Sequence, residues 1–191
     1  TFPPELYMSA SMIAEMADEF VSRGYNVTVF STIPSRPSGK TLAEYRSKSF
    51  FMQESILGYT LIRVRSWQIG RKRSKINRIM ENLLFGLISG CYLLFSHRYD
   101  RVVSIPWPNI CALIQACAAK IRGFPYYYFV MDLLPEQAES AGLINPDSLS
   151  HYFLLWLDKV ACRFSKGIFT LSVGLKRHIS VSRLVPENRI L

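Results

Sequence analysis

Residues 101–136, RVVSIPWPNICALIQACAAKIRGFPYYYFVMDLLPE, decide the fold class. An apolar run at 101–105 predicts a short strand, and the pattern at 109–122 predicts a helix that ends at Gly123. A second apolar run, at 126–131, predicts another strand. Strands that alternate with helices in this way are typical of a parallel sheet with helices on both faces.

The alternation extends outward in both directions. Ser9 or Ser11 is expected to cap a first helix that ends at Gly24, and Leu57-Gly58 indicates a hairpin toward one edge of the sheet. The sequence therefore predicts one α/β domain over 1–191, with a Rossmann-like, doubly wound and mostly parallel sheet. Its further helices are expected at 74–96, 146–164 and 173–182, its further strands at 26–31, 49–54, 59–65 and 167–171, and the start of one more strand at 190–191.

Composition narrows the function classes. The chain has 191 residues, 49% of them apolar, and a net charge of +9, so its surface attracts anions such as nucleic acid, acidic lipids or a diphosphate. The longest apolar stretch, 83–95, is shorter than the about 20 residues that cross a bilayer. Four cysteines without metal-site spacing, and no secretory leader pattern, favour a cytosolic protein without a metal.

Ligands of open parallel sheets bind outside the carboxyl ends of the strands, where the loop 132–136 is expected. Asp132 and Glu136 in this loop are candidates to accept a proton from, or hydrogen-bond, an incoming hydroxyl. The alternative is that Asp132 caps a turn. Trp107, beside Asn109 in another such loop, is either an aromatic wall for a sugar or a packing residue.

A basic segment lies just before and within the first turn of the helix expected at 74–96. Its cations oppose the helix dipole, and apolar residues at helical spacing follow them. The segment therefore predicts a surface for an anionic membrane or a diphosphate, although a solvated lead-in to a core helix is an equal alternative. Its residues are Arg71, Lys72, Arg73 and Lys75.

The sequence lacks the motifs of several enzyme classes. The chain has no G-x-G-x-x-G, no P-loop, no H-E-x-x-H, no G-x-S-x-G and no C-x-x-C. The three histidines lie far apart and are expected at helix ends or on the surface. Dinucleotide-binding, metalloprotease, α/β-hydrolase and thioredoxin functions are therefore not expected.

Four segments in order resemble the N-terminal domain of glycosyltransferase family 4, whose members have the GT-B fold. These are Phe2-Pro3-Pro4-Glu5, residues 23–29 (RGYNVTV), residues 123–143 with DLLPE and Gly142-Leu143, and residues 167–190 with GIFTLS and VPENRI. The third resembles a D-L-W-P-E…G-L block of bacterial members that build surface polysaccharides.

The resemblance implies the acceptor-binding half of a retaining glycosyltransferase at the cytoplasmic face of a membrane. The acceptor would be a glycan on a polyprenyl diphosphate, and a second domain, absent from this chain, would bind the nucleotide sugar. No cofactor is expected in this half. The implied site residues are Asp132 and Glu136 for catalysis, and Trp107, Asn109, Tyr7 and Ser9 for the acceptor.

The chain departs from the family in two places. Leu6-Tyr7-Met8-Ser9 stands where many members have a Gly-Gly pair, and the strand that normally precedes Phe2 is not in the sequence. The main alternative is a Rossmann-like, non-catalytic binding module with a basic face for nucleic acid or a membrane. Because the basic segment adjoins an apolar helix, lipid is favoured and nucleic acid is not expected.

Overall fold

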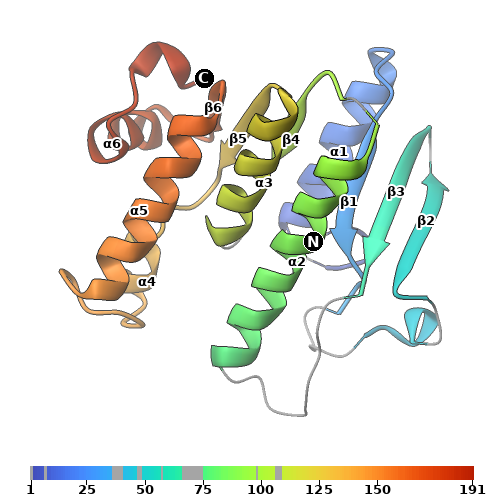
Figure 1. The fold of residues 1–191 in the computed structure, drawn as a ribbon, viewed down its shortest axis with the longest axis horizontal. Helices are drawn as coiled ribbons and strands as arrows, with labels where there is room; N and C mark the ends of the chain where they lie inside the picture. The colour runs from blue at the N-terminus through green and yellow to red at the C-terminus, as the bar shows by residue number, and fades with distance from the viewer. Residues whose placement is uncertain are drawn as a thin grey trace. The chain divides into compact units, whose positions relative to one another are not determined.

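A computed structural model describes residues 2–6, 8–35, 41–46, 49–56, 58–65, 75–97, 99–105 and 109–191. The chain divides into two compact units, an N-terminal unit, Thr1–Phe85, and a C-terminal unit, Gly86–Leu191. The described strands form two three-stranded sheets, one in each unit, which confirms the predicted α/β class (Figure 1). The single doubly wound sheet stays a prediction.

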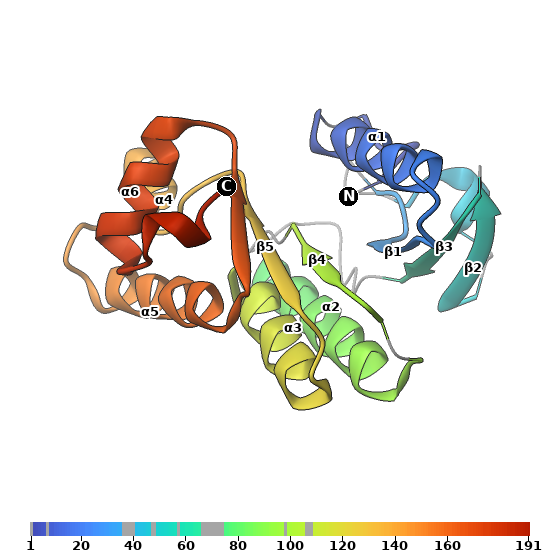
Figure 2. The ribbon, with the colours of Figure 1, turned by 90° about the horizontal axis from the view of Figure 1, so that it is seen from above.

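The N-terminal unit has a mixed sheet in the order β1-β3-β2, with α1 against one face (Figure 2). The strand β1 is parallel to β3, and β2 pairs with β3 as the predicted hairpin. Gly58 in its turn has φ +91°, and a Cβ there would lie 2.9 Å from the Val21 side chain. The bounds are α1 Met8–Ser22, β1 Thr28–Thr32, η1 Ala43–Tyr45, β2 Phe51–Ile56 and β3 Tyr59–Val64.

The predicted cap of α1 is wrong. The helix begins at Met8, so Ser9 and Ser11 both lie inside it. The chain enters α1 from a turn in which the Glu5 amide donates to the Phe2 carbonyl (3.3 Å). Phe2 itself is buried against Tyr59, with the rings edge to face at 5.9 Å. Residues 2–5 ahead of this helix are therefore held by a turn and by ring packing.

The C-terminal unit contains a parallel sheet in the order β4-β5-β6. The helices α3 and α5 lie side by side on the same side of it (Figure 2). Ile190 forms a parallel bridge with Ile168, where one more strand was predicted to start. The bounds are β4 Val102–Ser104, α3 Asn109–Arg122, β5 Tyr126–Val130, α4 Glu136–Ser140, α5 Leu149–Phe164, β6 Gly167–Thr170, α6 Val173–Arg183 and η2 Glu187–Arg189; α2, Lys75–Phe95, enters this unit at Gly86.

Small side chains on α3 bring it close to the sheet. Ala112, Ala116 and Ala119 are buried in one cluster with Tyr126 and Tyr128 of β5. The helix α5 begins at Leu149 rather than at 146 because the Ser148 side chain accepts a hydrogen bond from the His151 amide (3.2 Å) and caps it. None of the helices in the described residues is both long and apolar enough to cross a membrane.

Candidate functional site at the carboxyl ends of the parallel strands

Asp132 lies just after the carboxyl end of β5, as the order of elements predicts. Its side chain is exposed, and within the described residues its carboxylate has no hydrogen bond or ion pair. The residue preceding α4 is Pro135, and this helix has no side-chain cap. Asp132 therefore presents an unpaired carboxylate at the edge of the sheet where ligands of such folds bind.

Glu136, by contrast, is held by two basic side chains. Its Oε1 lies 2.5 Å from Nη1 of Arg183 and 3.0 Å from Nε2 of His178, and its Oε2 lies 2.8 Å from Nη2 of Arg183. Burial raises the pKa of Glu136, but the hydrogen bonds from Arg183 and His178 outweigh it and lower the pKa to about 2. A carboxylate with such a low pKa is a poor proton acceptor near neutral pH.

Arg183, the last residue of α6, is fully buried and uses all five of its N–H donors. Besides its two bonds to Glu136, its Nε donates to Oδ2 of Asp158 (2.7 Å) and its Nη2 to the Leu134 carbonyl (2.8 Å). Nη1 also donates to the Ser182 hydroxyl (3.0 Å). Burial lowers the pKa of Arg183, but hydrogen bonding to Glu136 and the charge of Asp158 raise it by more. The pKa of Arg183 therefore lies above its usual value, and the guanidinium stays charged.

Asp158 completes this arrangement from α5. It is 2% exposed, and its Oδ1 accepts a hydrogen bond from the Tyr128 hydroxyl of β5 (2.8 Å). Burial raises the pKa of Asp158 despite its bonds to Arg183 and Tyr128. Because the Leu134 carbonyl is bound too, the segment after Asp132 is tied to α6 and, through Arg183 and Asp158, to α5 and β5. We call this group the Arg183 cluster: Tyr128, Glu136, Asp158, His178 and Arg183.

Two more polar groups stand at this edge without partners among the described residues. Asn109, the first residue of α3, is 3% exposed, and its Nδ2 has no hydrogen bond to any of them. Thr170 ends β6, and its buried Oγ1 has no partner either. Buried polar atoms are normally satisfied, so unpaired ones at the end of a strand or the start of a helix are available to a ligand or a water molecule.

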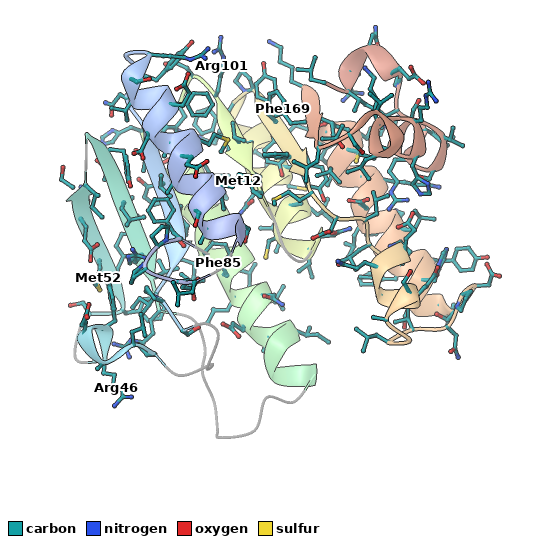
Figure 3. The ribbon with its side chains drawn as sticks, turned by 180° about the vertical axis from the view of Figure 1, so that it is seen from behind. Met12, Arg46, Met52, Phe85, Arg101 and Phe169 are labelled. Carbon is teal, nitrogen blue, oxygen red and sulfur yellow. The ribbon has the colours of Figure 1, made fainter. Side chains whose placement is uncertain are left out.

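An aromatic face accompanies these groups. Phe169, labelled in Figure 3, stacks on Tyr127 with a centroid distance of 5.8 Å and meets Phe129 edge to face at 6.3 Å. All three side chains are partly exposed. They alternate along β5 and β6 with the buried Tyr128 and Ile168, so they lie on the other face of the sheet.

Of the predicted site residues beyond Asp132, Glu136 and Asn109, the structure describes the side chain of Ser9 alone. Ser9 lies in α1 of the N-terminal unit. Lys75 begins α2, but its side chain is outside the described residues. Trp107, Tyr7, Arg71, Lys72 and Arg73 also lie outside them.

Glu5 of the resembling segment Phe2-Pro3-Pro4-Glu5 has a structural contact. It is 4% exposed, and its Oε1 accepts a hydrogen bond from the Ser35 amide (2.8 Å). This bond ties the start of the chain to the segment after β1. Among the described residues, no three His, Cys, Asp or Glu side chains lie close enough together to hold a metal ion.

Asp158, Arg183 and His178 were not among the site residues predicted from the sequence. Asp158 carries a signal, because an acidic residue between Leu157 and Val160 interrupts an apolar helical pattern. No comparable signal identifies Arg183, which is one of several basic residues on α6.

No family model matches the chain, and no curated protein sequence matches it. The resemblance to glycosyltransferase family 4 therefore rests on the four sequence segments and their order.

Proposed function

We propose that this chain is the acceptor-binding half of a retaining glycosyltransferase, which moves a sugar from a nucleotide sugar to a glycan on a polyprenyl diphosphate. The observation that supports this best is the exposed, unpaired carboxylate of Asp132 at the carboxyl end of β5. It lies beside a segment that the Arg183 cluster holds in place. A fixed carboxylate at a substrate-binding edge suits hydrogen bonding to an acceptor hydroxyl.

The proposal divides the two carboxylates of the loop between two roles. Asp132 contacts the acceptor hydroxyl and is the catalytic residue. Glu136, with a pKa of about 2 and both oxygens bound, is a positioning residue that anchors the loop to α6. The unpaired Nδ2 of Asn109 would donate to an acceptor oxygen. The donor sugar would be bound by a second domain.

The net charge of +9 favours two further parts of the proposal. An anionic membrane or the acceptor diphosphate would contact Arg71, Lys72, Arg73 and Lys75, and the protein would lie at the inner face of the membrane. The same charge also favours a second candidate function, that of a non-catalytic module that binds nucleic acid or lipid through its basic face. Such a module would need neither Asp132 nor the Arg183 cluster.

Asp132→Asn tests the catalytic role, in a protein that joins this chain to its nucleotide-sugar-binding domain. We expect turnover to fall by about 100-fold or more, because the variant cannot accept the hydroxyl proton, while nucleotide-sugar binding is unchanged. Turnover is measured as sugar transfer to a polyprenyl-diphosphate acceptor. Asp100→Asn, at another exposed aspartate of the same unit, is the control.

Unchanged turnover in Asp132→Asn would remove this residue from the mechanism. If the unsubstituted protein transfers no sugar and instead binds single-stranded RNA or anionic vesicles with a steep salt dependence, the binding-module function replaces the proposal.

A further inference from the structure

A second candidate site lies at the opposite ends of the strands. Lys120, Arg163 and Lys166 line a hollow of about 410 Å³ beside the amino ends of β5 and β6. The rings of Phe124 and Phe164 line it too. We call it the basic hollow. Since β5 has five residues, the basic hollow lies about 15 Å or more from Asp132, which follows the opposite end of that strand.

Within the part of the chain that the structure describes, carboxylates do not neutralise the cations of the basic hollow. No acidic residue of that part lines the hollow, and none of its ion pairs includes Lys120, Arg163 or Lys166. The Nζ of Lys120 lies 4.0 Å from the centre of the Phe164 ring, a cation–π contact that leaves its N–H donors unused. Three positive charges around one concave surface repel one another, and a bound anion would relieve this repulsion.

Basic residues often lie at helix C-termini to balance the helix dipole, and α3 and α5 both end here. Two of the last four carbonyls of α3, however, are already bound by backbone amides. The Gly123 amide donates to the Lys120 carbonyl (3.2 Å) and the Phe124 amide to the Ala119 carbonyl (2.8 Å). These two carbonyls therefore need no hydrogen bond from the Lys120 side chain.

Carbonyls at the end of α5 also have hydrogen-bond partners, here from side chains. The Ser165 hydroxyl donates to the Cys162 carbonyl (2.7 Å), and Nη2 of Arg189 donates to the same carbonyl (3.1 Å) and to that of Ser165. Lys166 follows the helix, and its backbone amide donates to the Tyr126 carbonyl (2.6 Å), whereas its side chain has no hydrogen bond to any residue that the structure describes. The side chains of Arg163 and Lys166 thus keep their donors for another group.

We propose that the basic hollow binds a phosphate-bearing ligand. The planar guanidinium of Arg163 suits two oxygens of a phosphate, and the two ammonium groups add point charges beside it. The volume of about 410 Å³ suits a single small molecule or lipid head group, and the rings of Phe124 and Phe164 suit its apolar part. The inference is independent of the proposed glycosyltransferase function, since it uses none of its residues.

The test measures binding of pyrophosphate to the whole chain by isothermal titration calorimetry at low ionic strength. A second arm measures sedimentation with vesicles of phosphatidylcholine, with and without phosphatidic acid, which separates a free phosphate compound from a lipid head group. The variant Arg163→Gln/Lys166→Gln removes two charges from the hollow. Its matched control, Lys176→Gln/Arg177→Gln, also removes one lysine and one arginine charge, but from α6. The side chains of Lys176 and Arg177 have no ion pair among the described residues.

We expect saturable binding in at least one arm. Arg163→Gln/Lys166→Gln should weaken the affinity about tenfold or more, and the control pair should weaken it less than about twofold, since charge-assisted hydrogen bonds act at short range. Circular dichroism establishes that both variants fold. The proposal is overturned if neither pyrophosphate nor phosphatidic acid binds. Equal losses in the two variants overturn it as well, because they indicate attraction by net charge alone.

Discussion

The two units each bury an arginine, and they accommodate it in different ways. Arg183 of the C-terminal unit makes five hydrogen bonds, to Glu136, Asp158, Leu134 and Ser182. Arg63 of the N-terminal unit is 1% exposed, yet its Nε and Nη1 have no hydrogen bond. Its Nη2 donates to the Pro3 carbonyl, and its Nε lies 3.6 Å from Glu54.

Aromatic rings replace part of this bonding around Arg63. Its Cζ lies 5.8 Å from the centre of the Phe2 ring and 5.4 Å from that of Tyr45, within the range of cation–π attraction. The carboxylate beside it, Glu54, has a side chain 26% exposed, whereas that of Asp158 beside Arg183 is 2% exposed. Burial of an arginine therefore does not by itself indicate its contribution to stability, because that depends on the charges left behind when it is removed.

The largest effect is expected for Arg183→Met. It should lower the free energy of unfolding of the C-terminal unit by about 3–5 kcal/mol, since it leaves Asp158 and Glu136 without their cation. Amide hydrogen exchange in β5 and α5 measures this unit alone. Arg177→Met, at an exposed position of the same helix, should change stability by less than about 0.5 kcal/mol. Similar small losses in both variants would contradict the importance of the Arg183 cluster.

A smaller effect is expected from Tyr128→Phe, which deletes one donor to Asp158. Burial strongly raises the pKa of Tyr128, so its hydroxyl is protonated and donates. Its loss should cost about 1–3 kcal/mol, because a buried carboxylate oxygen loses a hydrogen bond.

Tyr126→Phe is the matched control on the same face of β5. The Tyr126 hydroxyl donates to the Ala112 carbonyl at 3.2 Å, and its removal should cost about 1 kcal/mol. Hydrogen exchange of the β5 amides measures both variants. A loss in Tyr126→Phe equal to or above that in Tyr128→Phe would show that Asp158 does not depend on this bond.

The smallest effect is expected from Arg63→Met. The free energy of unfolding of the N-terminal unit should change by less than about 1 kcal/mol in either direction, because Glu54 is accessible to water and an apolar side chain suits the Phe2 and Tyr45 rings. Exchange of the β3 amides measures it. A loss above about 3 kcal/mol would mean that the two arginines contribute alike.

Much of the local structure follows from sequence pattern. The hairpin around Gly58, the helix at 109–122 and strands at 126–131 and 167–171 were predicted from apolar periodicity and turn residues, and each of these strands ends one residue earlier in the structure. Helix starts were harder: α5 starts at a cap on Ser148 and α1 ahead of its predicted caps, because capping and packing choose among several possible first residues.

The candidate site was predicted only in outline. Asp132 and Glu136 follow a strand in the sequence, so their position at its carboxyl end follows from the order of elements. Their opposite environments do not, because the partner of Glu136 is 47 residues away. Neither do the partnerless atoms of Asn109 and Thr170, which depend on what packs around them.

The sequence by itself determined the α/β alternation, the hairpin and the two carboxylates after β5, since these depend on residues near one another in the chain. Only the tertiary structure decided that Glu136 is a bound anion with a pKa of about 2 while Asp132 is unpaired. It also brought Lys120, Arg163 and Lys166 around one hollow. Burial and charge pairing act through space, so they were decided where segments distant in the sequence meet.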